Sequence, residues 1–264
     1  MNDVRKTCIT GKLPPPVGTS EWETFSQKCF CVDKTLMIKD IVDSVTTIAL
    51  FTRPRRFGKT TALKMIRAFF EKRLDEKGEQ VDTSYLFKDK KIWAAGETYR
   101  KLQGQFPVIY LTFKDHKSNC WEDALYDLQS TIGGECYRHM TAIETAAIDP
   151  LKRKQLASVA NREATPKELA ESLGFLAEAI HAHWKVKPVI LIDEYDQPIS
   201  SASTFGYYDQ MCSFMRVFLS GALKDNAHVE MGLMTGVLRV AKEGILSGLN
   251  NLKVYTVFDA AAEG

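Results

Sequence analysis

The sequence predicts an α/β fold built on a parallel β-sheet. Short apolar segments recur along the chain, at residues 46–51, 107–113, 189–192, 230–235 and 253–257. They are apolar throughout instead of alternating, which is typical of strands buried on both faces of a sheet. Segments with helical spacing separate them. With 264 residues, 45% of them hydrophobic and 26% charged, the chain can bury a large core without disulfides or metals.

The elements follow in order along the chain. Residues 1–30 form an N-terminal lead-in that we expect to pack on the core. Its stretch Leu13–Gly18 contains three prolines, which exclude a helix or a central strand there. Residues 31–259 are predicted to form one domain, and 260–264 a tail. A helix is predicted over 36–42, the first strand over 46–51, and a second helix over 62–70, where apolar residues repeat at helical spacing.

The stretch 114–187 predicts a helical insertion between the second and third strands. Trp121, Leu125 and Leu128 share one helical face. Further on, Thr165 and Glu168 have the spacing of a capping box, with proline at the first helical position between them. No flexible linker bounds this stretch, so we expect an insertion in one domain instead of a separate domain.

The charge is unevenly distributed. The net charge is only +2, which argues against a protein that is basic all over. The window Arg53–Arg73, however, holds eight basic residues against one acid, so it carries +7 and the rest of the chain −5. This indicates either one site for a polyanionic ligand or a solvated basic helix face, and charge alone favours the helix face.

Several classes of protein are disfavoured. The six cysteines lack zinc-ligand spacing, and His181 and His183 stand two apart in a predicted helix, so they point in different directions. No apolar run is long enough to cross a membrane, and the first residues lead into no secretory signal sequence. We therefore expect a cytoplasmic protein with reduced thiols and no membrane partner.

The segment between the first strand and the second helix resembles a phosphate-binding loop. Gly58, Lys59 and Thr60 match the second half of the pattern G-x-x-x-x-G-K-[ST], but Arg53 stands in place of the first glycine. Backbone N–H groups at a helix N-terminus can hold phosphate oxygens. Lys59 would then reach the β- and γ-phosphates, and Thr60 would offer its hydroxyl to Mg²⁺.

Two adjacent acids, Asp193 and Glu194, end the third apolar strand. Ligands bind at the carboxyl ends of strands in open α/β sheets. Asp193 beside a Mg²⁺-bound nucleotide would meet the need of a buried acid for a nearby cation, and Glu194 could act as general base on the attacking water. The alternative is a strand that ends in solvent, with both acids facing water.

The end of the fourth strand supplies two further candidates. Thr235 could sense the γ-phosphate or the water, and Arg239 could stabilise the transferring charge. By itself this element is weak, because a threonine and a glycine are also common where an ordinary strand leaves a sheet.

Four ordered motifs together resemble the AAA-ATPase-like domain family of P-loop proteins. They are residues 31–35 (CVDKT), 52–60 (TRPRRFGKT), 191–198 (LIDEYDQP) and 247–252 (SGLNNL), and the similarity spans about Trp22 to Phe258. In that family R-P-R-R-F-G-K-[ST] is the usual form of the loop, which accounts for Arg53. The sequence departs from the family at Leu238 and Ala241, where the family tends to carry serine, and at Cys31, which replaces a common aromatic residue.

The resemblance implies a three-layer αβα P-loop fold of the ASCE type, with a five-stranded parallel core sheet in the order 5-1-4-3-2. It implies catalytic roles for Glu194, Asp193, Lys59, Arg239 and Thr235, and magnesium ligation by Thr60 and Asp193. The implied nucleotide-binding residues are Arg55, Arg56, Phe57, Gly58, Lys59, Thr60, Thr61 and Asp33. Family members often continue into a restriction-endonuclease-like domain, which this chain, ending at Gly264, is expected to lack.

The leading functional hypothesis is an ATPase that uses ATP and Mg²⁺ to drive or time a conformational switch. One alternative is a nucleotide-binding switch or scaffold with little hydrolysis. Another is the NTPase half of a nucleic-acid-acting nuclease system, although nucleic acid is only weakly indicated, because most of the cations lie in or just after the loop. A small-molecule kinase would use the same parts. The arginines Arg55, Arg56 and Arg239 could also make contacts across a homo-oligomer interface.

Overall fold

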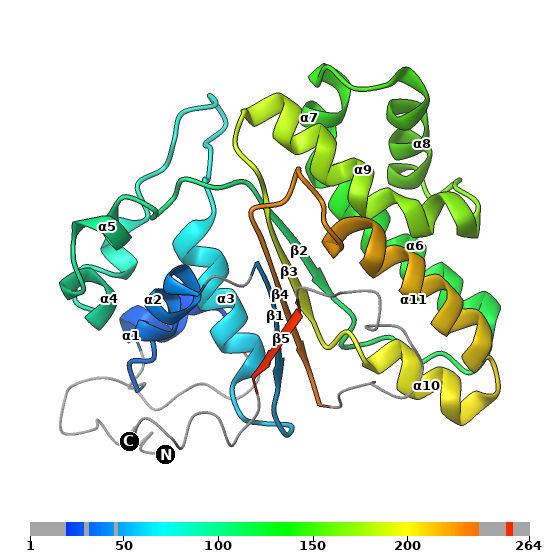
Figure 1. The fold of residues 1–264 in the computed structure, drawn as a ribbon, viewed down its shortest axis with the longest axis horizontal. Helices are drawn as coiled ribbons and strands as arrows, with labels where there is room; N and C mark the ends of the chain where they lie inside the picture. Colours follow the sequence, from blue (N-terminus) through cyan, green and yellow to red (C-terminus); the bar gives the residue numbers. More distant parts are fainter. Residues whose placement is uncertain (1–19, 29–31, 45–46, 238–251, 256–264) are drawn as a thin grey trace, which may run out of the picture. The chain divides into compact units, whose positions relative to one another are not determined.

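The computed structural model describes residues 20–28, 32–44, 47–237 and 252–255 (Figure 1). The chain divides into two units. The first comprises residues 1–45 and 60–106, and the second comprises residues 46–59 and 107–264. The second unit holds the sheet.

The sheet has five strands among the described residues, all parallel, and each overlaps a segment where the sequence predicts one. They are β1 (Ile48–Thr52), β2 (Val108–Thr112), β3 (Val189–Asp193), β4 (Met231–Gly236) and β5 (Leu252–Tyr255). Their order is β2-β3-β4-β1-β5, which read from the β5 edge is 5-1-4-3-2. Every residue of β3 is buried, as expected of an apolar central strand.

Six helices of the second unit lie together on one side of this sheet (Figure 1). They are α6 (Trp121–Arg138), α7 (Met140–Thr145), α8 (Pro150–Ala160), α9 (Pro166–Trp184), α10 (Gln197–Phe205) and α11 (Tyr208–Leu223). The first four fill the stretch between β2 and β3 that the sequence predicts to be helical. The capping box is confirmed at the start of α9, where the Thr165 hydroxyl accepts from the Glu168 N–H and the Glu168 carboxylate accepts from the Thr165 N–H.

Two glycines allow helices of this layer to meet at backbone distance. A Cβ added at Gly133 of α6 would lie 2.7 Å from the carbonyl oxygen of Val159 in α8. A Cβ at Gly174 of α9 would lie 2.6 Å from the carbonyl oxygen of Gly221 in α11. Because real side chains do not come this close, any larger residue at either position would push the two helices apart.

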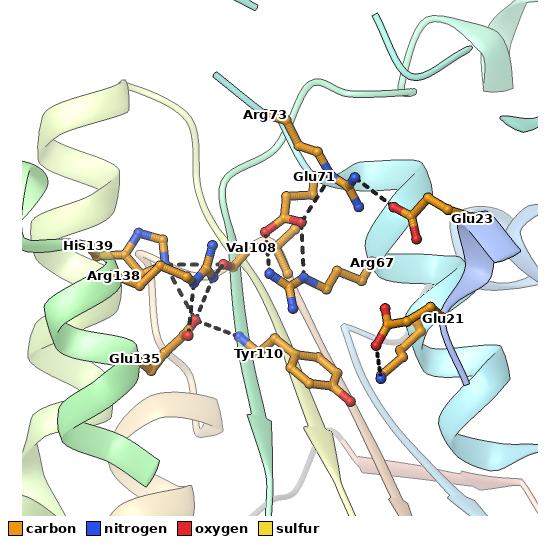
Figure 2. A network of polar contacts seen from close by, with 11 residues as sticks. Glu21, Glu23, Arg67, Glu71, Arg73, Val108, Tyr110, Glu135, Arg138 and His139 are labelled. Atoms are coloured by element: carbon orange, nitrogen blue, oxygen red, sulfur yellow. Dashed lines mark hydrogen bonds and ion pairs between the residues drawn. The ribbon is translucent and has the colours of Figure 1, made fainter. Parts of the chain in front are cut away.

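Side chains from the end of α6 cover the backbone of β2, which lies at one edge of the sheet (Figure 2). The Glu135 carboxylate accepts from the Tyr110 N–H at 2.8 Å. Arg138 and His139 donate to the carbonyl oxygen of Val108. An exposed edge strand is a template for pairing with another chain, and here side chains occupy its backbone groups instead.

Glu135 is a strongly perturbed acid as a result. Burial by itself would raise its pKa, but hydrogen bonds from His139 and Arg138 outweigh burial and lower the pKa to about 2. The carboxylate is only 7% exposed. It therefore stays charged inside the protein because its partners make up for the lost hydration.

The first unit contains the remaining helical elements. They are α1 (Trp22–Lys28), α2 (Leu36–Asp43), α3 (Lys59–Phe70, of which Lys59 itself falls in the second unit), the 3₁₀ helix η1 (Ser84–Leu86), α4 (Lys91–Ala94) and α5 (Glu97–Arg100). Part of the predicted lead-in is thus helical. It is held by a stack of Trp22 on Phe87, with ring centroids 5.8 Å apart.

Ion pairs neutralise much of the basic helix face that follows the loop (Figure 2). Arg67 makes a two-pronged contact with Glu71, both hydrogen bonds being 3.0 Å long. Arg73 pairs with Glu23 beside it, and Lys64 pairs with Glu21. These partly exposed cations therefore pair with three acids: Glu23 of α1, Glu21 just before α1 and Glu71 just after α3.

In the part of the chain that the structure describes, no helix is long and apolar enough to span a membrane. The three cysteines within that part, Cys120, Cys136 and Cys212, are free thiols.

Candidate functional site

The loop between β1 and α3 contains two residues with left-handed backbone conformation. Arg56 has φ 68° and Gly58 has φ 76°, so the chain is in the left-handed region twice within three residues. Nothing lies within 4 Å of a Cβ built at Gly58, so the glycine is needed for its backbone conformation and not for space. Arg55, Arg56 and Phe57 of this loop are exposed.

Lys59 turns back over the loop that precedes it. It is the first residue of α3 and only 8% exposed. Its ammonium Nζ donates to the carbonyl oxygens of Arg53 at 2.9 Å and Pro54 at 3.1 Å. The positive charge of Lys59 is thus held against the backbone of the loop.

The carboxyl ends of β3 and β4 lie side by side and bring two predicted residues into contact. The Thr235 hydroxyl donates to Oδ1 of Asp193 at 2.5 Å and accepts from the backbone N–H of Glu194 at 3.3 Å. Asp193 is fully buried and Thr235 is 3% exposed. One hydroxyl therefore fixes both acids of the predicted pair relative to β4.

Glu194 is in a strained and electrostatically unusual position. Its φ of 53° is left-handed, which is uncommon for a residue other than glycine and is typical of functional sites. Burial and the neighbouring Asp193 raise its pKa, with a further contribution from Asp196, while Lys59 and Arg55 oppose the shift. The pKa of the Glu194 carboxylate is thus raised by Asp193 and Asp196 and lowered by Lys59.

Beside Glu194 lies a small pocket of about 170 Å³. Its lining residues are Arg55, Glu194, Asp196, Gln197, Ser200 and Val237. A hydrogen bond of 3.4 Å joins the Arg55 guanidinium to Oε1 of Gln197 across this group. A loop cation and an acid that follows β3 therefore line the same cavity.

Sequence reasoning missed four residues of this pocket. Asp196 and Gln197 lie within the motif 191–198, and the acidic run Asp193–Asp196 is a signal that could have been followed further. Ser200 and Val237 carry no signal, because they reach the pocket only through the turn into α10 and the end of β4.

The remaining predicted residues are placed as follows. Thr60 and Thr61 are the second and third residues of α3. Asp33 accepts from the Thr35 N–H and hydroxyl and, through its other oxygen, from the Lys91 N–H. Its nucleotide-binding role stays a prediction, as do the roles of Thr60 and Thr61. Arg239 lies outside the described residues.

The donor atoms available for a metal fit Mg²⁺. The described residues contain no group of three or more histidine, cysteine, aspartate or glutamate side chains that could hold a metal ion. Asp193 offers a carboxylate oxygen, and Mg²⁺ is usually bound through one or two carboxylates together with substrate phosphates and waters. A soft or nitrogen-rich metal site would need different ligands.

The model of the protein family described as Predicted AAA-ATPase matches residues 16–246, which is most of the chain. The chain belongs to this family. Membership in the predicted AAA-ATPase family indicates an ATP-binding NTPase, and it agrees with the mixed α/β fold and its five-stranded parallel sheet.

This AAA-ATPase family member is also similar to a curated protein named "Uncharacterized protein in vnfD 5'region" from Azotobacter chroococcum mcd 1. The two are 26% identical over 248 residues, which cover 93% of this chain and 41% of that protein. The chain thus spans about two-fifths of the relative's length. No solved structure matches it.

Proposed function

We propose that this chain is a Mg²⁺-dependent ATPase that binds ATP at residues 53–61 and hydrolyses its β–γ phosphoanhydride bond, on a P-loop fold of three layers. The main support is the contact of one hydroxyl, that of Thr235, with both Asp193 and the backbone of Glu194. β1 pairs with β4, and β4 with β3. The loop that leads to Lys59 therefore leaves β1 at the same carboxyl end of the parallel strands where the two acids lie.

Nucleotide binding would exchange one set of partners for another. Lys59 now donates to two loop carbonyls, and phosphate oxygens would take over these bonds. N–H groups at the start of α3 would add hydrogen bonds, and the helix dipole favours negative charge there. Arg55 and Arg56, both exposed in the loop, would neutralise further phosphate charge.

Hydrolysis would depend on Glu194. Its carboxylate accepts a proton from water, the water oxygen attacks the γ-phosphorus, and the bond from this phosphorus to the bridging oxygen breaks to give ADP and inorganic phosphate. Asp193 and Thr60 would hold the magnesium ion, which neutralises charge on the phosphate oxygens. Thr235 would keep the two acids in register through its two hydrogen bonds.

Release of the γ-phosphate would end the contacts that the loop and the acids make with it, and the loss of such contacts is how nucleotide hydrolysis times a conformational switch. The alternative of a nucleotide-dependent switch with little turnover uses the same binding residues. Under this alternative, Glu194 would have no effect on the rate of ATP hydrolysis.

A panel of ATP and GTP binding and phosphate-release assays tests this proposal. Lys59→Ala should abolish nucleotide binding, since it removes the cation of the loop. Lys64→Ala is the matched control: it removes a lysine from the same helix, one paired with Glu21, and should bind as the wild type does. Glu194→Gln should bind ATP normally but release phosphate about 10²- to 10⁴-fold more slowly, the usual contribution of a general base.

Absence of nucleotide binding by the wild type would refute the proposal. Equal and slow phosphate release by the wild type and Glu194→Gln, with ATP still bound, would instead support the switch.

A further inference from the structure

The turn that follows Glu194 is attached to the end of β4. The Tyr195 N–H donates to the carbonyl oxygen of Thr235 at 3.1 Å. One residue later, Oδ2 of Asp196 accepts from the Val237 N–H at 2.9 Å. The turn is therefore bonded to Thr235 in β4 and to Val237 just after the strand, on either side of Gly236.

Gly236 itself leaves room for this contact. A Cβ at this position would lie 2.7 Å from Cε1 of the Tyr195 ring and 2.9 Å from Oδ1 of Asp196. Both side chains are almost fully buried, at 0% and 4% exposed, so neither can move aside into solvent. Only glycine lets the turn come this close to the strand end.

The side chain of Asp196 gives up its usual local role to make this bond. Asp196 is the N-cap residue of α10, and an N-cap aspartate normally accepts from an N–H of the first helical turn. Here the side chain makes no such capping bond and accepts instead from the N–H of Val237, the residue after β4. Burying a carboxylate is costly, so its use at a strand end 41 residues away requires a reason beyond starting the helix.

The reason lies in the contacts of the two residues on either side of Gly236, Thr235 and Val237. Thr235, whose hydroxyl holds Asp193 and the Glu194 backbone, lies in β4 two residues before Val237, and Val237 follows directly after the strand. A bond at Val237 fixes the direction in which β4 leaves the sheet, and so keeps Thr235 facing the two acids.

We propose that Asp196 is a positioning residue of this site, holding the end of β4 so that the Thr235 hydroxyl and the Glu194 carboxylate keep their relative places. The role rests on the proposed ATPase function. Asp196 acts through Val237 and Thr235 and need not touch the nucleotide.

The experiment compares Asp196→Ala with Asp196→Asn in steady-state ATP hydrolysis. The alanine variant loses the acceptor for the Val237 N–H, and we expect kcat to fall about 10- to 100-fold, the cost of a slightly misplaced catalytic group, while the KM for ATP changes little. The asparagine variant keeps a carbonyl oxygen at the same place and should restore most of kcat. Asp209→Ala, an exposed acid at the start of α11, is the matched control and should behave as the wild type.

Two further measurements keep the test decisive if Asp196→Ala fails to fold. Gly236→Ala leaves Asp196 intact but forces it and Tyr195 away from β4, and should lower kcat in the same way. Amide hydrogen exchange of Val237 in the wild type needs no activity, and we expect this N–H to be protected.

Wild-type kcat in Asp196→Ala, or a Val237 amide that exchanges at the unprotected rate in the folded wild type, would overturn this role and leave the ATPase proposal standing. A wild type without turnover would refute the ATPase proposal, and the role of Asp196 with it.

Discussion

Replacing Glu135 with glutamine should destabilise the protein by an amount that depends on pH. The folded pKa is about 2 and the ordinary value 4.5, a difference of about 2.5 units. At 1.36 kcal/mol per unit, the charged carboxylate contributes about 3 kcal/mol of stability at pH 7. Because the folded pKa is the lower one, this contribution is complete above pH 4.5 and is lost as the pH falls toward 2. About half of it should remain at pH 3.

The assay is urea unfolding of the wild type and Glu135→Gln at pH 7 and pH 3, followed by tryptophan fluorescence. Trp121 and Trp184, on α6 and α9, report on the unit that contains Glu135. The variant should be about 3 kcal/mol less stable at pH 7, with a gap roughly half as large at pH 3. Faster exchange of the Tyr110 amide should accompany the loss, since Glu135 accepts from it.

Glu144→Gln is the matched control, because Glu144 is an exposed acid on the neighbouring helix α7 and should change stability little at either pH. Equal stability of the wild type and Glu135→Gln, or a gap that stays constant with pH, would refute the reasoning.

Three more predictions concern strain, packing and ionisation. Glu194→Gly relieves a left-handed backbone and should raise the free energy of unfolding by about 1 kcal/mol while phosphate release falls as in Glu194→Gln; a less stable variant would contradict this. Gly133→Ala should lower the free energy of unfolding by about 1–3 kcal/mol in thermal or urea unfolding, because the added methyl group meets α8. The adjacent and exposed Gly134 has nothing within 4 Å of an added Cβ, so Gly134→Ala should raise that free energy by about 0.5–1 kcal/mol, and equal effects would argue against the close crossing. The pKa of His181 is lowered below 6.5, first by burial and then by His228, whose Nδ1 lies 3.0 Å from that of His181. NMR titration should therefore show a low pKa for His181 that rises in His228→Ala, and an unchanged pKa would exclude the contact.

The parts of this fold that were predictable are those encoded by neighbours in sequence. A strand buried on both faces is apolar throughout, so the apolar run 189–192 predicts such a strand without knowledge of its neighbours. Thr165 and Glu168 cap their helix from three residues apart. The loop at Gly58 and Lys59 is likewise local, since its turn and the following helix start are specified within one short segment.

What could not be predicted depends on segments that meet only after folding. Glu135 satisfies the backbone of Tyr110, 25 residues away, and no pattern in either segment shows this. The same holds for Asp196, because an aspartate before a helix predicts a cap and its bond to Val237 appears only when β3 and β4 pair. Thr235 could be proposed as a sensor, but its bond to Asp193 required the register of two strands.

The two hydrogen bonds of the Thr235 hydroxyl run in a fixed donor-to-acceptor order. A hydroxyl carries one proton, so when that proton is given to Asp193, the oxygen can serve the Glu194 N–H only as an acceptor. The bonds therefore form a one-way chain that runs from the peptide N–H of Glu194 through the Thr235 hydroxyl to the carboxyl group of Asp193. Because hydrogen bonds in a chain polarise one another, the backbone beside the proposed base is linked to the proposed metal ligand through this one hydroxyl.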